Sequence, residues 1–183
     1  MPTIQPPARP RISRKELQQL LLEHEVSSPV GLVGIRGYYR DSMGEAGTND
    51  RGIYDDCIAL VSPDTTATWN ANVDPSVHRP GIASLVPGVW RYQIGIHGLS
   101  RPKDQQYKAL VQAAPVLVHR DRKGHDRGWF GINIHRGGKG GTSSLGCQTI
   151  PPDQWPAFIA LVEQEMRRNG LSQIPYLLTV AAP

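Results

Sequence analysis

The stretch Trp129-Phe-Gly-Ile-Asn-Ile-His-Arg-Gly-Gly-Lys-Gly-Gly-Thr-Ser-Ser-Leu-Gly-Cys147 organises the rest of the chain. Its apolar start, residues 129–134, favours a β-strand that leads into His135. A loop with four glycines and three hydroxyl residues follows, and it ends in Gly146-Cys147. Because glycine adopts backbone conformations that other residues avoid, such a loop can fold back on the strand. The stretch therefore predicts that His135 and Cys147 lie close together.

The sequence on both sides predicts a mostly β domain of the α+β class, with an N-terminal helix and a helix after the cysteine. Ser13 and Glu16 fit a capping box, and leucines at helical spacing then predict a helix over 14–24. Apolar residues over 155–166 form one face of a second helix, which Asn169-Gly170 ends. The many glycines and prolines favour turns between short strands. We expect strands over residues 31–39, 53–61, 66–73, 88–96 and 174–180.

The charged segment 120–127 is expected to be a solvated hairpin loop, because it mixes both signs of charge. The strands that it joins are predicted over 115–119 and 128–134. The whole chain carries a net charge of +4, and the excess is scattered. No basic stripe is interleaved with aromatic residues, so a nucleic-acid partner is not expected.

A chain of 183 residues is most simply one domain. We expect residues 13–183 to form it, as a monomer, and the proline-rich residues 1–12 to form a flexible arm. The apolar runs are too short to span a bilayer, so no stable membrane insertion is expected. The N-terminus lacks the apolar core of a signal peptide, which predicts synthesis in the cytoplasm without one.

The two cysteines stand in different sequence contexts. Cys57 lies in a strand-like run and is expected to be a small buried hydrophobe. Cys147 lies in a glycine loop, where a thiol is more readily exposed and activated. A neighbouring histidine can take the thiol proton and form an ion pair, and the peptide N–H of Cys147, with that of Gly146 or Leu145, can face a developing oxyanion. No His or Cys spacing is typical of a zinc site, so no metal and no cofactor is expected.

The residues alone leave alternatives open. The loop can equally be a tight glycine turn with a buried thiol and a surface histidine. His97, within Gly95-Ile-His-Gly98, lies 50 positions before Cys147, and we expect it to be structural or supporting rather than the base. Asp55 and Asp56 are adjacent, and surface or loop-pinning roles are expected for them.

The motif as a whole resembles the signature of the L,D-transpeptidase (YkuD-type) catalytic domain. That family has Ile-His-Gly on a strand, then a loop, then Ser/Thr-His-Gly-Cys before a helix. Here Ile132-Asn-Ile-His-Arg-Gly137 and Thr142-Ser-Ser-Leu-Gly-Cys147 are similar to these two parts. The segment Leu85-Val-Pro-Gly-Val-Trp-Arg-Tyr92 resembles the hairpin motif Pro-x-Gly-x-Tyr that precedes the active site. The resemblance covers roughly residues 50–165 and is most specific over 132–148.

The resemblance implies an L,D-transpeptidase-like β-sandwich that acts on peptidoglycan stem peptides through a thioacyl enzyme. It assigns Cys147 as the nucleophile, His135 as the base, and Ser144 and Gly146 as residues that shape the loop. Arg136 next to the base is a candidate for gripping a stem-peptide carboxylate. The expected substrate contacts are Arg136, Gly137, Ser143, Leu145 and Gln148.

The chain departs from the family at the acceptor side of the motif. Leu145 stands where the family usually has a second histidine, and Gln148 replaces a small apolar residue. These changes favour water as the acceptor, which predicts a carboxypeptidase or endopeptidase that lyses the cell wall, as a phage endolysin or injected effector does. It would act in the periplasm or cell wall after release or injection. The alternatives are an L,D-transpeptidase that cross-links peptidoglycan, and a non-catalytic wall-binding or virion structural module.

Overall fold

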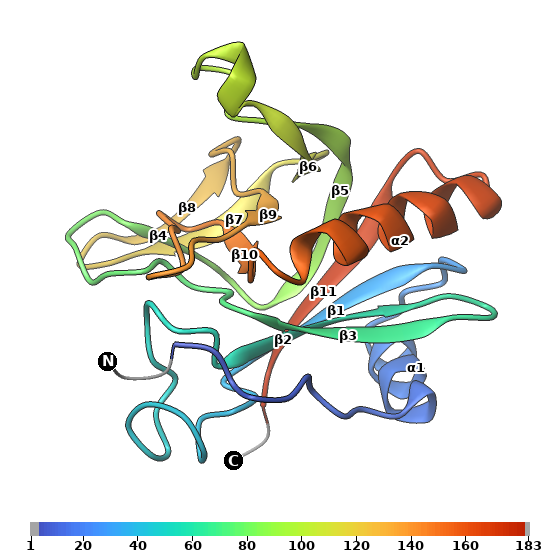
Figure 1. Ribbon diagram of the computed structural model, residues 1–183, viewed down its shortest axis with the longest axis horizontal. Coiled ribbons are helices and arrows are strands. Elements are labelled where there is room, and N and C mark those ends of the chain that lie inside the picture. The colour runs from blue at the N-terminus through green and yellow to red at the C-terminus, as the bar shows by residue number, and fades with distance from the viewer. Residues whose placement is uncertain (1–3, 182–183) are drawn as a thin grey trace.

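The computed structural model describes residues 4–181 and contains eleven β-strands and two α-helices within them, which confirms the mostly β, α+β class (Figure 1). Eight strands form one sheet in the order β10-β9-β6-β5-β11-β1-β2-β3. Their bounds are β1 Gly31–Arg36, β2 Asp56–Val61, β3 Thr66–Ala71, β5 Gly88–His97, β6 Tyr107–Gln112, β9 Ile134–Arg136, β10 Gln148–Ile150 and β11 Ile174–Val180. A second sheet has the order β4-β7-β8, with β4 Ala83–Leu85, β7 Val116–Arg120 and β8 Gly124–Gly128.

The large sheet closes on itself. Asn72, directly after β3, and Thr149 in β10 exchange backbone hydrogen bonds of 2.9 and 2.8 Å. This single residue pair joins the two ends of the large sheet. The expected sandwich thus takes the form of a closed eight-stranded sheet beside a three-stranded one. Pairing is parallel between β1 and β11 and between β9 and β10, and antiparallel elsewhere in the sheet.

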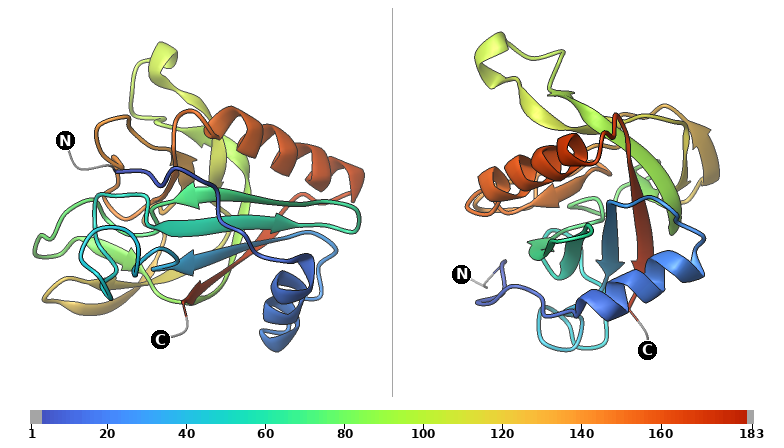
Figure 2. Two further views of the ribbon diagram at one scale, coloured as in Figure 1. Left: turned by 60° about the horizontal axis from the view of Figure 1, so that its bottom comes forward. Right: turned by 90° about the vertical axis from the view of Figure 1, so that its right-hand side faces the viewer.

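Two apolar clusters fill the fold, one for each helix. The larger cluster includes Trp69, Tyr92 and Leu110, and α2 (Trp155–Arg168) packs on it with the ring of Phe158 5.0 Å from that of Trp69. The smaller cluster lies beneath α1 (Arg14–Glu23), whose buried leucines meet β1, β2 and β11. Figures 1 and 2 show the two helices on opposite sides of the β1–β2–β3 part of the sheet.

The predicted helices and the last strand are confirmed. The capping box is present: the Ser13 N–H donates to Glu16 Oε2 at 2.8 Å, and the Glu16 N–H donates to Ser13 Oγ at 3.2 Å. It fixes the start of α1, and Leu17 and Leu21 bury its apolar face. The strand predicted over 174–180 is β11, at the centre of the large sheet.

The prediction for 115–134 is wrong in its pairing. β7 pairs with β8, most of which lies in the charged segment 120–127, and residues 129–133 form no strand. Charged residues suit an exposed strand of a small sheet, and the turn between the strands is tight because Arg122 (φ 62°) and Gly124 (φ 81°) are left-handed. The strand predicted over 31–39 ends at Arg36, where Gly37 has a φ of 70°. Strands β4, β6 and β10 were not predicted.

The described part of the predicted N-terminal arm, residues 4–12, lies against the domain. The Ile4 carbonyl accepts the Tyr54 N–H at 2.7 Å, and the Pro10 carbonyl accepts the Thr68 hydroxyl at 2.6 Å. The Ala8 carbonyl accepts the Tyr39 hydroxyl at 2.9 Å. These contacts tie residues 4–12 to the large sheet and its loops, while residues 1–3 of the predicted arm lie outside the described residues.

Candidate active site

Parallel pairing of β9 and β10 brings the two ends of the glycine loop together. Gln148 pairs with Ile134 and Thr149 pairs with His135, so Cys147 comes to lie beside Asn133. The Cys147 Sγ accepts the Asn133 N–H at 3.4 Å, and its S–H donates to the Gly131 carbonyl at 3.3 Å. The unpaired segment 129–133 therefore holds the thiol with its backbone.

His135 is buried, and its Nδ1 faces two oxygens. Nδ1 lies 2.8 Å from the carbonyl of Arg136 and 3.2 Å from the hydroxyl of Tyr107, which itself donates to that carbonyl at 3.3 Å. A carbonyl oxygen can only accept, so this contact assigns the ring proton to Nδ1. Nε2 then carries the free lone pair, which is the state that a general base needs.

The thiol and the imidazole are both held uncharged. Burial raises the pKa of Cys147 to about 11, and the Asn133 N–H only partly offsets it. Burial, followed by the positive charge of His97, lowers the pKa of His135 to about 4. Within residues 4–181 no hydrogen bond joins Cys147 to His135. The expected ion pair is therefore corrected to a neutral thiol and a neutral imidazole, because loss of solvent at the partly buried Cys147 and the buried His135 disfavours both charged forms.

Among the described residues, some backbone N–H groups around Cys147 have a hydrogen-bond acceptor and others have none. The Gly146 N–H donates to Ser144 Oγ at 3.0 Å, and that hydroxyl donates to the Cys147 carbonyl at 2.7 Å. Within residues 4–181, the N–H groups of Leu145 and Cys147 have no acceptor. The candidate oxyanion donors are therefore those of Cys147 and Leu145, and Gly146 is not one of them.

The backbone conformation and close packing at position 146 require glycine. Its φ is 131°, a conformation that side chains rarely adopt. A Cβ on Gly146 would lie 2.4 Å from the carbonyl oxygen of Ala83 and 3.0 Å from Ile132. The first residue of β4 thus approaches the backbone at Gly146 closely.

The rest of the loop is clamped from two sides. On one side the Ser144 N–H donates to Ser76 Oγ at 2.8 Å, the Ser76 N–H donates to the Ser144 carbonyl at 2.9 Å, and Thr142 Oγ1 lies 2.6 Å from Ser76 Oγ. On the other side Gln148 is fully buried, donates to the Gly146 carbonyl at 3.2 Å and accepts from the Tyr176 hydroxyl at 3.1 Å. Gln148 thus supports the loop, and its side chain leaves no surface for the predicted substrate contact.

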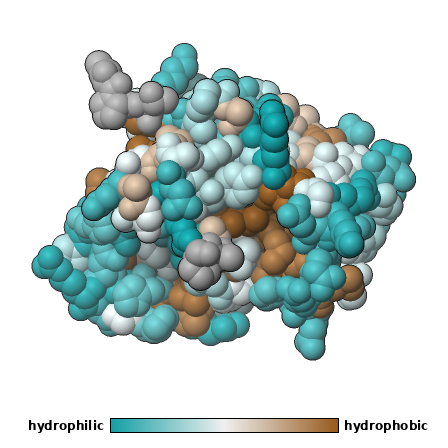
Figure 3. All heavy atoms as spheres, turned by 90° about the horizontal axis from the view of Figure 1, so that it is seen from below, coloured by the Kyte–Doolittle hydropathy of each residue, from teal (hydrophilic) through white to brown (hydrophobic). Residues whose placement is uncertain are grey.

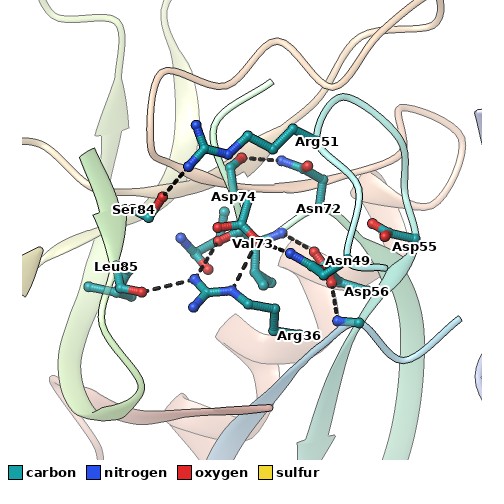
Figure 4. A network of polar contacts seen from close by, with 12 residues as sticks. Arg36, Asn49, Arg51, Asp55, Asp56, Asn72, Val73, Asp74, Ser84 and Leu85 are labelled. Atoms are coloured by element: carbon teal, nitrogen blue, oxygen red, sulfur yellow. Dashed lines mark hydrogen bonds and ion pairs between the residues drawn. The ribbon is translucent and has the colours of Figure 1, made fainter. Parts of the chain in front are cut away.

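A buried polar network fixes the segment 72–76 that carries Ser76 (Figure 4). Asp74 pairs with Arg36 at 2.9 Å, and the Arg36 guanidinium also donates to the Leu85 carbonyl at 2.9 Å. Asp56 accepts the Val73 N–H at 2.6 Å. The loop-pinning role expected for Asp56 is therefore confirmed, at a buried position rather than at the surface.

Beside His135 lies a mostly polar pocket of about 360 Å³. The connection between β5 and β6, which projects from the molecule in Figure 1, forms one wall of this pocket. Of the predicted substrate contacts, Arg136, Gly137 and Ser143 line it, together with Arg101 and Tyr107. The Arg136 guanidinium lies 4.9 Å from the centre of the Tyr107 ring, which holds it at the pocket.

Two further pockets are lined by largely different residues from those of the pocket at His135. Leu145, 66% exposed, lines a pocket of about 530 Å³ with Ser76 and residues 140–144. A groove of about 890 Å³ runs between α1 and the end of β11, and the apolar surface of this underside is visible in Figure 3. His135 lines neither of these two pockets, and Cys147 lines none of the three.

Sequence reasoning missed or underrated three residues of the site. His97 lies flat against His135, with ring centres 4.0 Å apart and planes 22° apart. Asn133 contacts both the thiol and His97, and Tyr107 contacts His135. The Ile-His-Gly pattern at residue 96 was the one signal for His97, whereas nothing local indicates that β6 lies beside β9, with β5 next to β6.

No protein-family model, curated protein or solved structure matches this chain. In the described part of the chain, no helix has the length and apolar character to cross a membrane. Nor do residues 4–181 contain three His, Cys, Asp or Glu side chains grouped so that they could hold a metal ion.

Proposed function

We propose that the chain is a cysteine-dependent enzyme that cleaves peptidoglycan stem peptides through a thioacyl intermediate on Cys147. The proposal is carried by the parallel pairing of β9 and β10, which sets Cys147 beside Asn133, two residues before His135, and by the free N–H of Cys147. His135 is neutral and has its proton on Nδ1. The motif resemblance supplies the substrate class. On this reading the enzyme acts in the periplasm or cell wall, after release or injection.

The reaction follows from the two neutral groups. As Sγ attacks a stem-peptide carbonyl, the thiol proton passes to Nε2 of His135, which needs the thiol to turn from the Gly131 carbonyl. The N–H groups of Cys147 and Leu145 stabilise the oxyanion. His135 then gives the proton to the leaving amine, and the thioacyl bond forms. Water, deprotonated by His135, attacks the thioester and restores the thiol.

The acceptor is proposed to be water. An amine acceptor must lose a proton before it can attack, and a second histidine in the loop would be placed to take it. The exposed Leu145 at that position has no group that accepts a proton. Transpeptidation is the second candidate. A non-catalytic wall-binding module is the third, and the raised pKa of the thiol favours it, because a resting thiol is a weak nucleophile.

Digestion of purified sacculi by the wild type and by Cys147→Ala tests the proposal, with the muropeptides identified by mass spectrometry. Trimmed or separated stem peptides from the wild type alone would support hydrolysis, and cross-linked dimers would support transpeptidation. Cys57→Ala is the control, since this thiol is buried beneath α1. Full activity in Cys147→Ala would refute the mechanism, and binding without any product from the wild type would support the non-catalytic module.

A further inference from the structure

The imidazole of His97, at the end of β5, contacts the ring of His135 and has no role in the proposed reaction. Its ring lies flat against His135, with centres 4.0 Å apart. His97 pairs across the sheet with Tyr107, whose hydroxyl contacts His135 Nδ1. One face of the candidate base is thus covered by a second titratable ring, and this ring comes from a strand 38 residues earlier in the chain.

Asn133 connects His97 to the nucleophile. Its side-chain amide donates to His97 Nδ1 at 3.3 Å, which leaves the proton of neutral His97 on Nε2. Its backbone N–H donates to the Cys147 Sγ at 3.4 Å. The same residue therefore orients the stacked ring through its side chain and the thiol through its main chain.

Two stacked imidazoles cannot both be protonated without strong repulsion, because the charges would lie about 4 Å apart. The other charged groups at His135 are Arg101 in the β5–β6 connection and Arg136 on its own strand, and both act in the same direction. Asp104 lines the same pocket and is the single carboxylate among the residues that line it. Tyr107, whose hydroxyl contacts His135, is uncharged at neutral pH.

We propose that His97 is a positioning residue: its stacked ring and its hydrogen bond to Asn133 hold His135 uncharged and oriented with Nε2 free. The inference deepens the proposed function, on which its catalytic consequence rests. The ring interaction itself is a property of the folded protein and is tested without any substrate.

The test is an NMR titration of the imidazole nitrogens in wild type, His97→Gln and His97→Phe, from about pH 3 to about pH 8. Glutamine keeps a hydrogen-bond acceptor for Asn133 and removes the charge, and phenylalanine keeps the ring and removes both the charge and the hydrogen bond. In both variants the midpoint of His135 should rise by about one pH unit, because the like charge is gone. In wild type the two rings should titrate as a coupled pair.

His119→Gln is the matched control, because this exposed histidine lies in β7 and is not among the residues that act on His135. An unchanged His135 midpoint in both folded His97 variants would overturn the inference, whatever the activity on sacculi. If hydrolysis is found, the acid limb of kcat/KM should move to higher pH in His97→Gln by the same amount as the midpoint. A loss of activity with an unmoved acid limb would mean a structural role alone.

Discussion

Cys147 and His135 are both neutral, because the fold buries His135 and removes part of the solvent around Cys147. The thiol should therefore react slowly with iodoacetamide at pH 7, at a rate that keeps rising toward about pH 11. The rate is measured by mass spectrometry in Cys57→Ala, where one thiol remains. A rate that levels off below about pH 8 would show a thiolate stabilised by His135 and contradict this assignment. Slow alkylation is expected of an active and of an inactive site alike, so the digestion of sacculi separates them.

Gly146 offers a second test at the residue scale. Gly146→Ala places a Cβ 2.4 Å from the Ala83 carbonyl at a φ of 131°, so the loop must shift. We expect a loss of about 1–3 kcal/mol in the free energy of unfolding, together with loss of cleavage, because the Cys147 N–H moves with the loop. Urea unfolding measures the first effect. Gly140→Ala, where a Cβ meets nothing within 4 Å, is the control and should be neutral.

The identity of the central residues was predictable from the sequence, and their chemical state was not. His135 and Cys147 belong to one short stretch, and glycine between a strand and a cysteine is a local signal. The burial that shifts the pKa of His135 involves residues such as His97 and Tyr107, which β5 and β6 bring in from elsewhere in the chain. A pattern within one stretch carries no information on such neighbours.

At the scale of elements, helices were easier to predict than short strands. α1 has a capping box and α2 has an apolar face, and both signals are contained in the element itself. β8 consists of charged residues and glycines, so its sequence favours a loop. It becomes a strand because β7 supplies hydrogen-bonding partners along its whole length. The strand character of such a segment depends on its neighbour rather than on its own residues.

The hydrogen bond from Tyr176 in β11 to Gln148, directly after the glycine loop, can be tested at this scale. In Tyr176→Phe the buried Gln148 Oε1 loses its donor, which should destabilise the fold by about 1–3 kcal/mol. Tyr92→Phe is the matched control. Its ring packs edge-on against Tyr176 at 5.7 Å, and its buried hydroxyl has no hydrogen-bond partner among residues 4–181. Removal of that hydroxyl should be neutral or stabilising. Equal losses in the two variants, measured by urea unfolding, would contradict the role of the Tyr176 hydrogen bond.

At the scale of the whole molecule, the site depends on contacts between distant parts of the chain. The bridge between Asn72 and Thr149 closes the large sheet and sets β10 beside β3. The network around Arg36 and Asp74 then fixes the segment that holds Ser144 through Ser76. The sequence indicated the α+β class but not this closure, because pairing across such separations is decided by the packing of all strands together.

The buried carboxyl group of Asp55, close to this network, should make the stability of the fold depend on pH. Asp55 is fully buried, and burial, followed by the charges of Asp74 and Asp50, raises its pKa to about 7. Its Oδ2 accepts the Asp50 N–H at 2.9 Å, which opposes the shift only in part. In the unfolded chain the pKa is about 3.9. A group whose folded pKa is raised stabilises the fold at low pH, and this contribution is lost as pH rises through the folded value.

The stability of wild type relative to Asp55→Asn should therefore fall between about pH 4 and about pH 7, by roughly 2–4 kcal/mol, and stay level above that. Asparagine cannot ionise, and its side-chain oxygen can still accept the Asp50 N–H, so the variant keeps the hydrogen bond without the buried charge. Urea unfolding across this pH range gives the difference. Asp64→Asn, whose side chain is 77% exposed, is the control for an Asp-to-Asn substitution at the surface. If wild type instead became more stable relative to Asp55→Asn as pH rises, Asp55 would be charged in the folded protein. Its hydrogen-bonding partners would then outweigh its burial.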